Sequence, residues 1–161
     1  MDLQLAGQVA VVVGGANGIG RAIAAAFGAE GCRVAVVDRV EAAGFGGLGI
    51  VADVADFPAV QRAAEAVRLT YGRCDHVVFA AGVGSGKVGF PFWNLDPADW
   101  DRVLRVNLVG AVHVAHAFAP AMAAAGSGTV LFLGSVAGQI GSQTDPPYSA
   151  SKAGLINFAQ C

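Results

Sequence analysis

Charge is scarce in this sequence of 161 residues, in which 14% of the residues are charged and 55% are hydrophobic. The formal net charge is only -2, and the few basic residues are scattered along the chain. Binding to nucleic acid or to an anionic membrane needs a concentrated basic surface, which this sequence lacks. The composition therefore favours one compact domain, residues 1–161, that acts on a small molecule.

Cysteine is also rare. Cys32, Cys74 and Cys161 are odd in number and lack the spacing of metal ligands, so we expect free buried thiols and a reducing cytoplasm. His113 and His116 lie one helical turn apart, but neither a cysteine nor a carboxylate lies nearby to complete a metal set. We expect no metal site.

The start of the chain, Met1 to Leu5, has neither the charged region nor the long apolar region of a signal peptide. Further along, every apolar run of membrane-spanning length is interrupted by glycine or charge. We therefore expect a soluble, cytoplasmic protein without membrane or nucleic-acid partners.

What the sequence has in abundance is glycine, at 23 residues, placed between apolar runs and alanine-rich helical segments. A strand, a glycine turn, a helix and a second strand within about 30 residues form a βαβ unit, which predicts an α/β fold with a parallel sheet. Expected strands are 8–13, 33–38, 48–51, 75–81 and 129–133; expected helices are 18–30, 57–71 capped by Asp56, 97–125 bent at Pro120, and one starting near Tyr148.

The last predicted helix is still running at Cys161, with no glycine stop or polar cap. We therefore expect the sequence to be a fragment of a longer domain. The fifth strand would otherwise keep an unpaired edge, which a longer chain or another subunit must cover.

The first strand is followed by a glycine pattern, Gly14-x-x-x-Gly18-x-Gly20, which opens a helix. Backbone N–H groups and the helix dipole at such a turn bind a pyrophosphate, and glycine permits close approach. The pattern also fits a tight turn in any α/β protein, but its place in a βαβ unit favours dinucleotide binding. The cofactor-binding candidates in this turn are Gly14, Asn17, Gly18, Ile19 and Gly20.

Asp38 ends the second strand, 18 residues after Gly20. A carboxylate there accepts hydrogen bonds from both ribose hydroxyls and repels a 2′-phosphate, which selects NAD over NADP. Arg39 beside it leaves the alternative open, since its cation can pair with that phosphate.

Tyr148 and Lys152 stand four residues apart and so share one helix face. A neighbouring cation favours the phenolate and lowers the tyrosine pKa from about 10, so that the phenol can exchange protons with a carbinol near neutral pH. Such a pair is common on helix surfaces, but this one follows a strand-end serine, Ser135, by thirteen residues.

Taken in order, these motifs resemble the motif pattern of the short-chain dehydrogenase/reductase family. The resemblance spans the whole of this chain. The matching positions are the glycine pattern, Asp38, Asn107, Ser135 and Tyr148-Ser149-Ala150-Ser151-Lys152. The resemblance implies a doubly wound Rossmann-type sheet with strand order 3-2-1-4-5 and NAD at the switch point between the first and fourth strands.

The same resemblance assigns roles to individual residues. Tyr148 is the acid/base, and Lys152 lowers its pKa and holds the nicotinamide ribose. Ser135 binds the substrate oxygen, and Asn107 positions a helix backbone and a water in a proton relay. The residues implied to contact the cofactor further along the chain are Asp53 and Val54 at the adenine, and Ala81 and Gly82.

Two positions depart from the family pattern. Val13 replaces a threonine, and Phe79-Ala80-Ala81-Gly82 replaces Asn-Asn-Ala-Gly. If the lost hydroxyl and amide bonded each other in relatives, their joint loss strands no buried partner. We expect these changes to affect stability and not catalysis.

An aromatic segment follows Gly82, with Phe90, Phe92, Trp93 and Trp100. It fits a substrate pocket beyond the carboxyl ends of the strands or a cover for the long helix, and the sequence favours neither.

The predicted function is hydride transfer between NAD(H) and a secondary alcohol or ketone that the sequence does not identify. One alternative is a 3-oxoacyl thioester reductase using NADPH, against which Asp38 counts. Another is a non-catalytic nucleotide-binding scaffold, against which the presence of all four implied catalytic residues counts: Asn107, Ser135, Tyr148 and Lys152. The resemblance also implies a homodimer or homotetramer through the long and final helices, where Ala111, Ala115 and Ala119 permit close packing.

Overall fold

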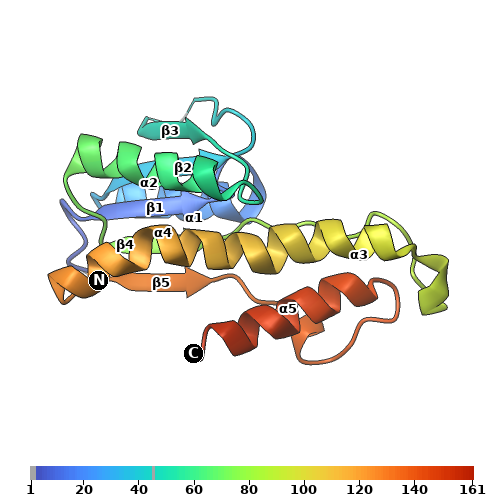
Figure 1. Cartoon of the computed structure of the whole chain (residues 1–161). Coiled ribbons are helices and arrows are strands. Elements are labelled where there is room, and N and C mark those ends of the chain that lie inside the picture. Colours follow the sequence, from blue (N-terminus) through green and yellow to red (C-terminus); the bar gives the residue numbers. More distant parts are fainter. Residues whose placement is uncertain (1–2, 45) are drawn as a thin grey trace.

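The structure is a computed structural model that describes residues 3–44 and 46–161. Its centre is a five-stranded parallel sheet in the order β3-β2-β1-β4-β5 (Figure 1), as the sequence predicts. The strands are β1 (Val9–Val13), β2 (Arg33–Asp38), β3 (Leu48–Val51), β4 (His76–Phe79) and β5 (Thr129–Phe132).

Helices cover both faces of this sheet. Helix α1 packs on one face, while α2, the long α3–α4 stretch and α5 lie on the other (Figure 1). The α-helices are α1 (Gly18–Ala29), α2 (Phe57–Tyr71), α3 (Pro97–Leu104), α4 (Gly110–Ala125) and α5 (Pro146–Phe158); shorter elements are the 3-10 turns η1 (Phe92–Asn94) and η3 (Val136–Gly138) and the π-helical η2 (Arg105–Val109).

Strand β1 is central, and each of its residues is at most 1% exposed. Val9, Val11 and Val13 enter the core beneath α2, α4 and α5, while Val12 enters the second core beneath α1. Both faces of the strand are therefore apolar, which is why its sequence is a continuous apolar run and not an alternating one.

The long helical stretch contains one irregularity. Pro120, where the sequence predicts a bend, lies inside α4, and the stretch departs from α-helical hydrogen bonding at the π-helical η2 around Asn107. By length and composition Pro97–Ala125 is apolar enough to cross a membrane, a test that core helices of soluble proteins also pass. Gly110 interrupts this stretch, and in the fold the stretch packs against the helices α2 and α5.

Several element boundaries differ from the sequence prediction. Strand β4 ends at Phe79 and not at Ala81, and the short turn η1 forms within the aromatic segment after Gly82. Helix α5 begins at Pro146, after the capping residue Asp145, and ends at Phe158 before the predicted Cys161. Asp56 does precede α2, but its side chain makes no capping hydrogen bond.

The two positions that depart from the family pattern are neighbours in the sheet. Val13 on β1 pairs in register with Phe79 on β4, and both side chains lie in the same core cluster. An apolar pair thus occupies the place of two polar groups. Among the described residues no buried side-chain nitrogen or oxygen lacks a hydrogen-bond partner, as expected if the two changes compensate each other.

Two glycines of the first turn are required by close backbone contacts. A Cβ atom on Gly20 would lie 2.1 Å from the Gly14 carbonyl oxygen, so α1 can begin this close to β1 only with glycine there. Gly14 has a φ of 81°, and its Cβ atom would lie 2.5 Å from the Ala81 nitrogen. The turn is therefore pressed against the end of β4.

Replacing Gly20 with alanine should lower the free energy of unfolding by about 1 to 3 kcal/mol, because the added methyl group has no room. Gly28 in the same helix is the matched control, since its Cβ atom would meet nothing within 4 Å. Gly28→Ala should stabilise the fold by about 0.4 to 1 kcal/mol. Urea unfolding measures the change in the free energy of unfolding for each variant. Equal changes at Gly20 and Gly28 would show that the close contact at Gly20 is not what requires glycine.

Candidate active site

A cavity of about 310 Å³ opens at the carboxyl ends of β1, β2 and β4. This is the edge at which parallel α/β sheets bind ligands. The predicted cofactor residues that line it are Gly14, Asn17, Gly18, Asp38, Asp53, Val54, Ala81 and Gly82. Ile19 and Gly20 do not line it: the Ile19 side chain is 65% exposed, and Gly20 acts through the close contact with Gly14.

The first turn of α1 forms one wall of this cavity and is open to an anion. Gly18 has a φ of 54°, and a Cβ atom there would meet nothing within 4 Å. The N-cap Asn17 makes no side-chain capping bond, and the first turn has no acidic residue. No carboxylate of the helix's own first turn therefore neutralises the positive end of the helix dipole at the cavity, which suits a phosphate group.

Asp38 lies at the other wall, half-buried at the end of β2. Its Oδ2 accepts a hydrogen bond from the Ala16 N–H at 3.0 Å, and its Oδ1 accepts one from Val40 at 3.3 Å. These bonds hold the carboxylate at the cavity and leave it lone pairs for a ligand hydroxyl. Arg39 is exposed and lines the same cavity.

Asp53 and Val54 are held at the cavity by the chain around them. The Asp53 Oδ1 accepts a hydrogen bond from Ala55, and the Val54 carbonyl oxygen lies 2.8 Å from Nδ1 of His113. Val54 also packs on Gly110, where a Cβ atom would lie 2.7 Å from its Cγ2. His113 therefore has a structural partner, and its ring also packs at a tilt of 36° against Phe57.

Asn107 connects three parts of the site. Its amide group is fully buried, with Oδ1 accepting from the Val83 N–H at 2.8 Å and Nδ2 donating to the Val83 carbonyl at 2.9 Å. Nδ2 also donates to Oγ of Ser151 at 2.9 Å, and Ser151 donates to the Tyr148 carbonyl. The long helix, the loop after β4 and α5 are thus joined through one side chain.

Lys152 is 4% exposed, and its ammonium donates to the Leu133 carbonyl at 2.7 Å. Burial lowers the pKa of this ammonium below its usual value of 10.5. A Cβ atom on Gly82 would lie 3.6 Å from both Lys152 Nζ and Asn107 Oδ1. Helix α5 therefore reaches this cavity at Gly82, although Lys152 does not itself line it.

Tyr148 is half-buried in the first turn of α5. The Lys152 Nζ lies 5.7 Å from the centroid of its ring, so the predicted pair does share one helix face. Ser135 follows β5, and its Oγ accepts a hydrogen bond from the Ala137 N–H. Gly138 in the same turn packs on the α5 backbone, since a Cβ atom there would lie 2.7 Å from the Lys152 carbonyl carbon.

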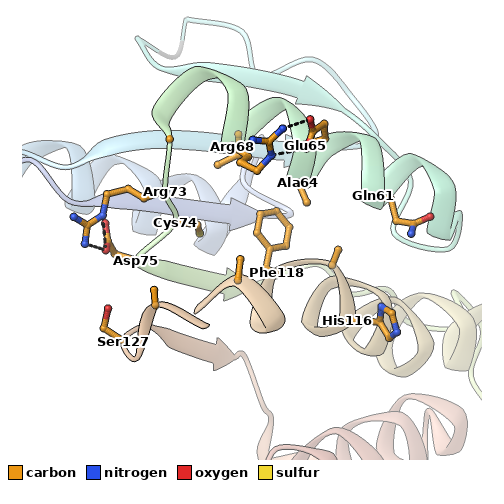
Figure 2. Close-up of a pocket in the computed structure, with 15 residues that line it drawn as sticks. Gln61, Ala64, Glu65, Arg68, Arg73, Cys74, Asp75, His116, Phe118 and Ser127 are labelled. Carbon is orange, nitrogen blue, oxygen red and sulfur yellow. Dashed lines mark hydrogen bonds and ion pairs between the residues drawn. The ribbon is translucent and has the colours of Figure 1, made fainter. Parts of the chain in front are cut away.

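A larger cavity of about 730 Å³ lies between α2 and α4, with Phe118 and Cys74 facing it (Figure 2). Its charged groups are already paired, Arg68 with Glu65 and Arg73 with Asp75. It contains none of the predicted site residues. Burial, with the nearby Asp75, raises the pKa of the Cys74 thiol to about 12, so this thiol stays protonated and is not a nucleophile.

Other sequence expectations meet mixed outcomes. All three cysteines are free as expected, but none is fully buried: Cys32 and Cys74 are half-buried, and Cys161 is exposed. The side chains of Phe90, Phe92 and Trp93 are 62 to 71% exposed, and neither they nor the half-buried Trp100 line the cavity of about 310 Å³.

Sequence reasoning missed several supporting residues. Val83 and Val106 also line the cavity, and Ser151 is the buried link between Asn107 and α5. Asp145 caps α5 through the Tyr148 N–H. Its signal was in the sequence, because an aspartate directly before a proline often starts a helix.

Comparison with known proteins gives one consistent result. The family model for short chain dehydrogenases matches residues 8–161. A D-threitol dehydrogenase from Mycolicibacterium smegmatis is 37% identical over 170 residues, and an acetoacetyl-CoA reductase from Synechocystis is 36% identical over 159 residues. The crystal structure of a metagenomic short-chain oxidoreductase in complex with NADP superposes with a TM-score of 0.88 at 37% identity. This chain belongs to the short chain dehydrogenase family.

The alignments cover nearly all of this chain but only part of each relative. The alignments cover 99% of this chain but 64% of the D-threitol dehydrogenase, and 98% of this chain but 65% of the acetoacetyl-CoA reductase. The NADP complex is matched over 97% of this chain and 75% of its own. The chain thus spans about two thirds of the length of these relatives.

The buried Lys152 predicts a pH dependence of stability. Below its lowered pKa the ammonium is charged in both states, and the folded state bears the full cost of burying it. Between that pKa and 10.5 the folded state releases its proton first, so this cost declines as pH rises. Lys152→Met should therefore stabilise the fold most near pH 7, with a smaller gain at pH 10.

Urea unfolding of both proteins at the two pH values measures this. Lys87→Met is the matched control, because its hydrogen bond to Asp99 raises the pKa of the exposed Lys87. A raised pKa keeps its contribution constant between pH 7 and pH 10. A gain for Lys152→Met that grows with pH would contradict the assigned direction.

Proposed function

We propose that this chain is the cofactor-binding and catalytic part of an oxidoreductase that transfers hydride between NAD(H) and a secondary alcohol or ketone. The observation that carries the proposal is the position of Gly82. It lines the cofactor cavity, and a Cβ atom there would contact both Asn107 and Lys152. A ligand seated at Gly82 would thus meet the helix that carries Tyr148.

The cavity suits a dinucleotide. The open first turn of α1 at Gly14 and Gly18 would hold the pyrophosphate, Asp38 the adenosine ribose, and Asp53 with Val54 the adenine. Lys152 would hold the nicotinamide ribose. When bound, the nicotinamide ring supplies or accepts the hydride.

The residues of the chain would handle the proton. The Tyr148 phenolate would accept the proton of an alcohol, and the phenol would donate it to a ketone oxygen in the reverse direction. The Lys152 cation would favour the phenolate, and the Ser135 hydroxyl would donate a hydrogen bond to the substrate oxygen. Asn107 would keep α5 and the loop after β4 in register.

NAD is the proposed cofactor, since the Asp38 carboxylate favours ribose hydroxyls over a 2′-phosphate. Arg39 in the same cavity offers a cation to that phosphate, and the metagenomic relative is described in complex with NADP. The name of the Synechocystis relative, acetoacetyl-CoA reductase, keeps thioester reduction as the second candidate substrate class. The intact set of Ser135, Tyr148 and Lys152 argues against a scaffold without catalysis.

We also propose a cytoplasmic homodimer or homotetramer that pairs through α4 and α5. Val109 and Val112 on the long helix are 41% and 38% exposed, which leaves apolar surface for a second copy. Ala115 and Ala119 are half-buried and fit this role. Ala111 does not, because it is fully buried in the core of its own chain.

Asp38→Ala should weaken NAD binding about tenfold or more, since charge-assisted hydrogen bonds to the ribose are lost, while NADP loses a repulsion. Loss of the bond to Ala16 disturbs the turn for both cofactors, so the ratio of dissociation constants is the measurement. Asp56→Ala removes the same charge outside the cavity and should leave that ratio unchanged. A wild-type preference for NADP would show that Asp38 is misassigned.

Tyr148→Phe should keep cofactor affinity and lower turnover by about 10² to 10⁴, because only the proton-transferring hydroxyl is removed. Steady-state kinetics of the full-length protein with a ketone panel, together with calorimetry of NADH binding, separates the two effects. Tyr71→Phe is the control: Tyr71 is the other of the two tyrosines, and its hydroxyl bonds Leu48 and Val34 instead. Ordinary turnover in Tyr148→Phe would refute the mechanism.

A further inference from the structure

Asp145 stands directly before α5 and uses both carboxylate oxygens. Oδ1 accepts a hydrogen bond from the Tyr148 N–H at 3.4 Å, which caps the helix. Oδ2 accepts a bond from the Ser85 N–H at 2.9 Å, 60 residues away in the loop after β4. One side chain therefore ties the start of the catalytic helix to that loop.

The loop itself is fixed at two further points. Asn107 holds both backbone groups of Val83, and the Arg102 guanidinium donates to the carbonyls of Gly84 and Ser85. Both of these anchors are on the long helix. Asp145 supplies the anchor from α5, so the loop is held between the two helices.

The contact between Asp145 and the loop is close. A Cβ atom on Gly84 would lie 2.7 Å from Oδ2 of Asp145, so only glycine leaves room for the carboxylate at this position. Ser85 is itself only 6% exposed, and its hydroxyl donates to the Lys87 carbonyl, which closes the loop on itself. The Asp145 carboxylate thus contacts a loop segment that has room for it at Gly84 and is held by its own hydrogen bonds.

We propose that Asp145 is a positioning residue that fixes the start of α5, and with it Tyr148, against the loop after β4. The inference rests on the proposed function, in which Tyr148 transfers the proton. Capping alone needs one oxygen, and serine is as good an N-cap as aspartate. The second oxygen, which reaches Ser85, is what makes aspartate necessary at this position.

Asp145→Ser tests the bridge separately from the cap. Serine can still cap α5, but its shorter side chain cannot also reach Ser85. Amide hydrogen exchange at Ser85 should accelerate about tenfold or more, while the Tyr148 amide stays protected. Asp145→Ala should release both amides.

Asp96→Ser is the matched control, because Asp96 is the N-cap of α3 and also precedes a proline. It should alter thermal stability to a similar degree without changing exchange at Ser85. A fluorine label on Tyr148, with Tyr71→Phe as background, reports the environment of the ring without any need for activity. Its resonance should shift or broaden in Asp145→Ser and stay unchanged in Asp96→Ser.

Turnover provides the functional readout. In Asp145→Ser, kcat should fall about tenfold with cofactor affinity unchanged, whereas Asp96→Ser should keep its kcat. Equal losses of kcat in both variants, or an unchanged fluorine resonance and Ser85 exchange rate in Asp145→Ser, would overturn the proposal. If the wild-type protein turns over no alcohol or ketone, the proposed function fails, and the exchange and fluorine results still decide whether Asp145 positions Tyr148.

Discussion

The buried amide of Asn107 is the interaction on which the site depends. Its three hydrogen bonds join the long helix to Val83 after β4 and, through Ser151, to α5. A fully buried amide is expensive unless its groups are paired, so these segments can adopt only arrangements that pair them. Asn107 lies in the π-helical turn, where the long helix departs from the regular α-helical hydrogen-bond pattern.

The proposed cofactor-binding half and the proposed catalytic half of the site are built by different kinds of interaction. The cofactor half relies on close backbone approach, where Gly14 and Gly20 let the first turn press against β1 and β4. The proposed catalytic half relies on burial, which places the Lys152 ammonium against the Leu133 carbonyl and lowers its pKa. A buried ammonium costs stability, and such costs are typical of groups kept for function and not for folding.

Sequence patterns predicted the parts of the fold that local chemistry determines. Strands β2 and β3 and helix α2 have the expected bounds, because apolar runs and helix signals there agree with their tertiary surroundings. The features that the sequence patterns did not reveal are those that depend on contacts between residues distant in the sequence. The π-helical turn at Asn107, the core position of Ala111 and the bridge from Asp145 to Ser85 all depend on partners far away in the sequence, which periodicity does not reveal.

In the proposed function, the glycine turn, Asp38 and α5 form one cofactor site joined at Gly82. An NMR titration of the isotope-labelled protein with NAD tests this most directly, because it needs no substrate. If these parts form one site, the amide resonances of Gly18, Gly82 and Lys152 will shift together with one dissociation constant. Shifts confined to the cavity around Phe118, or shifts at Gly18 without any at Gly82 and Lys152, would contradict it.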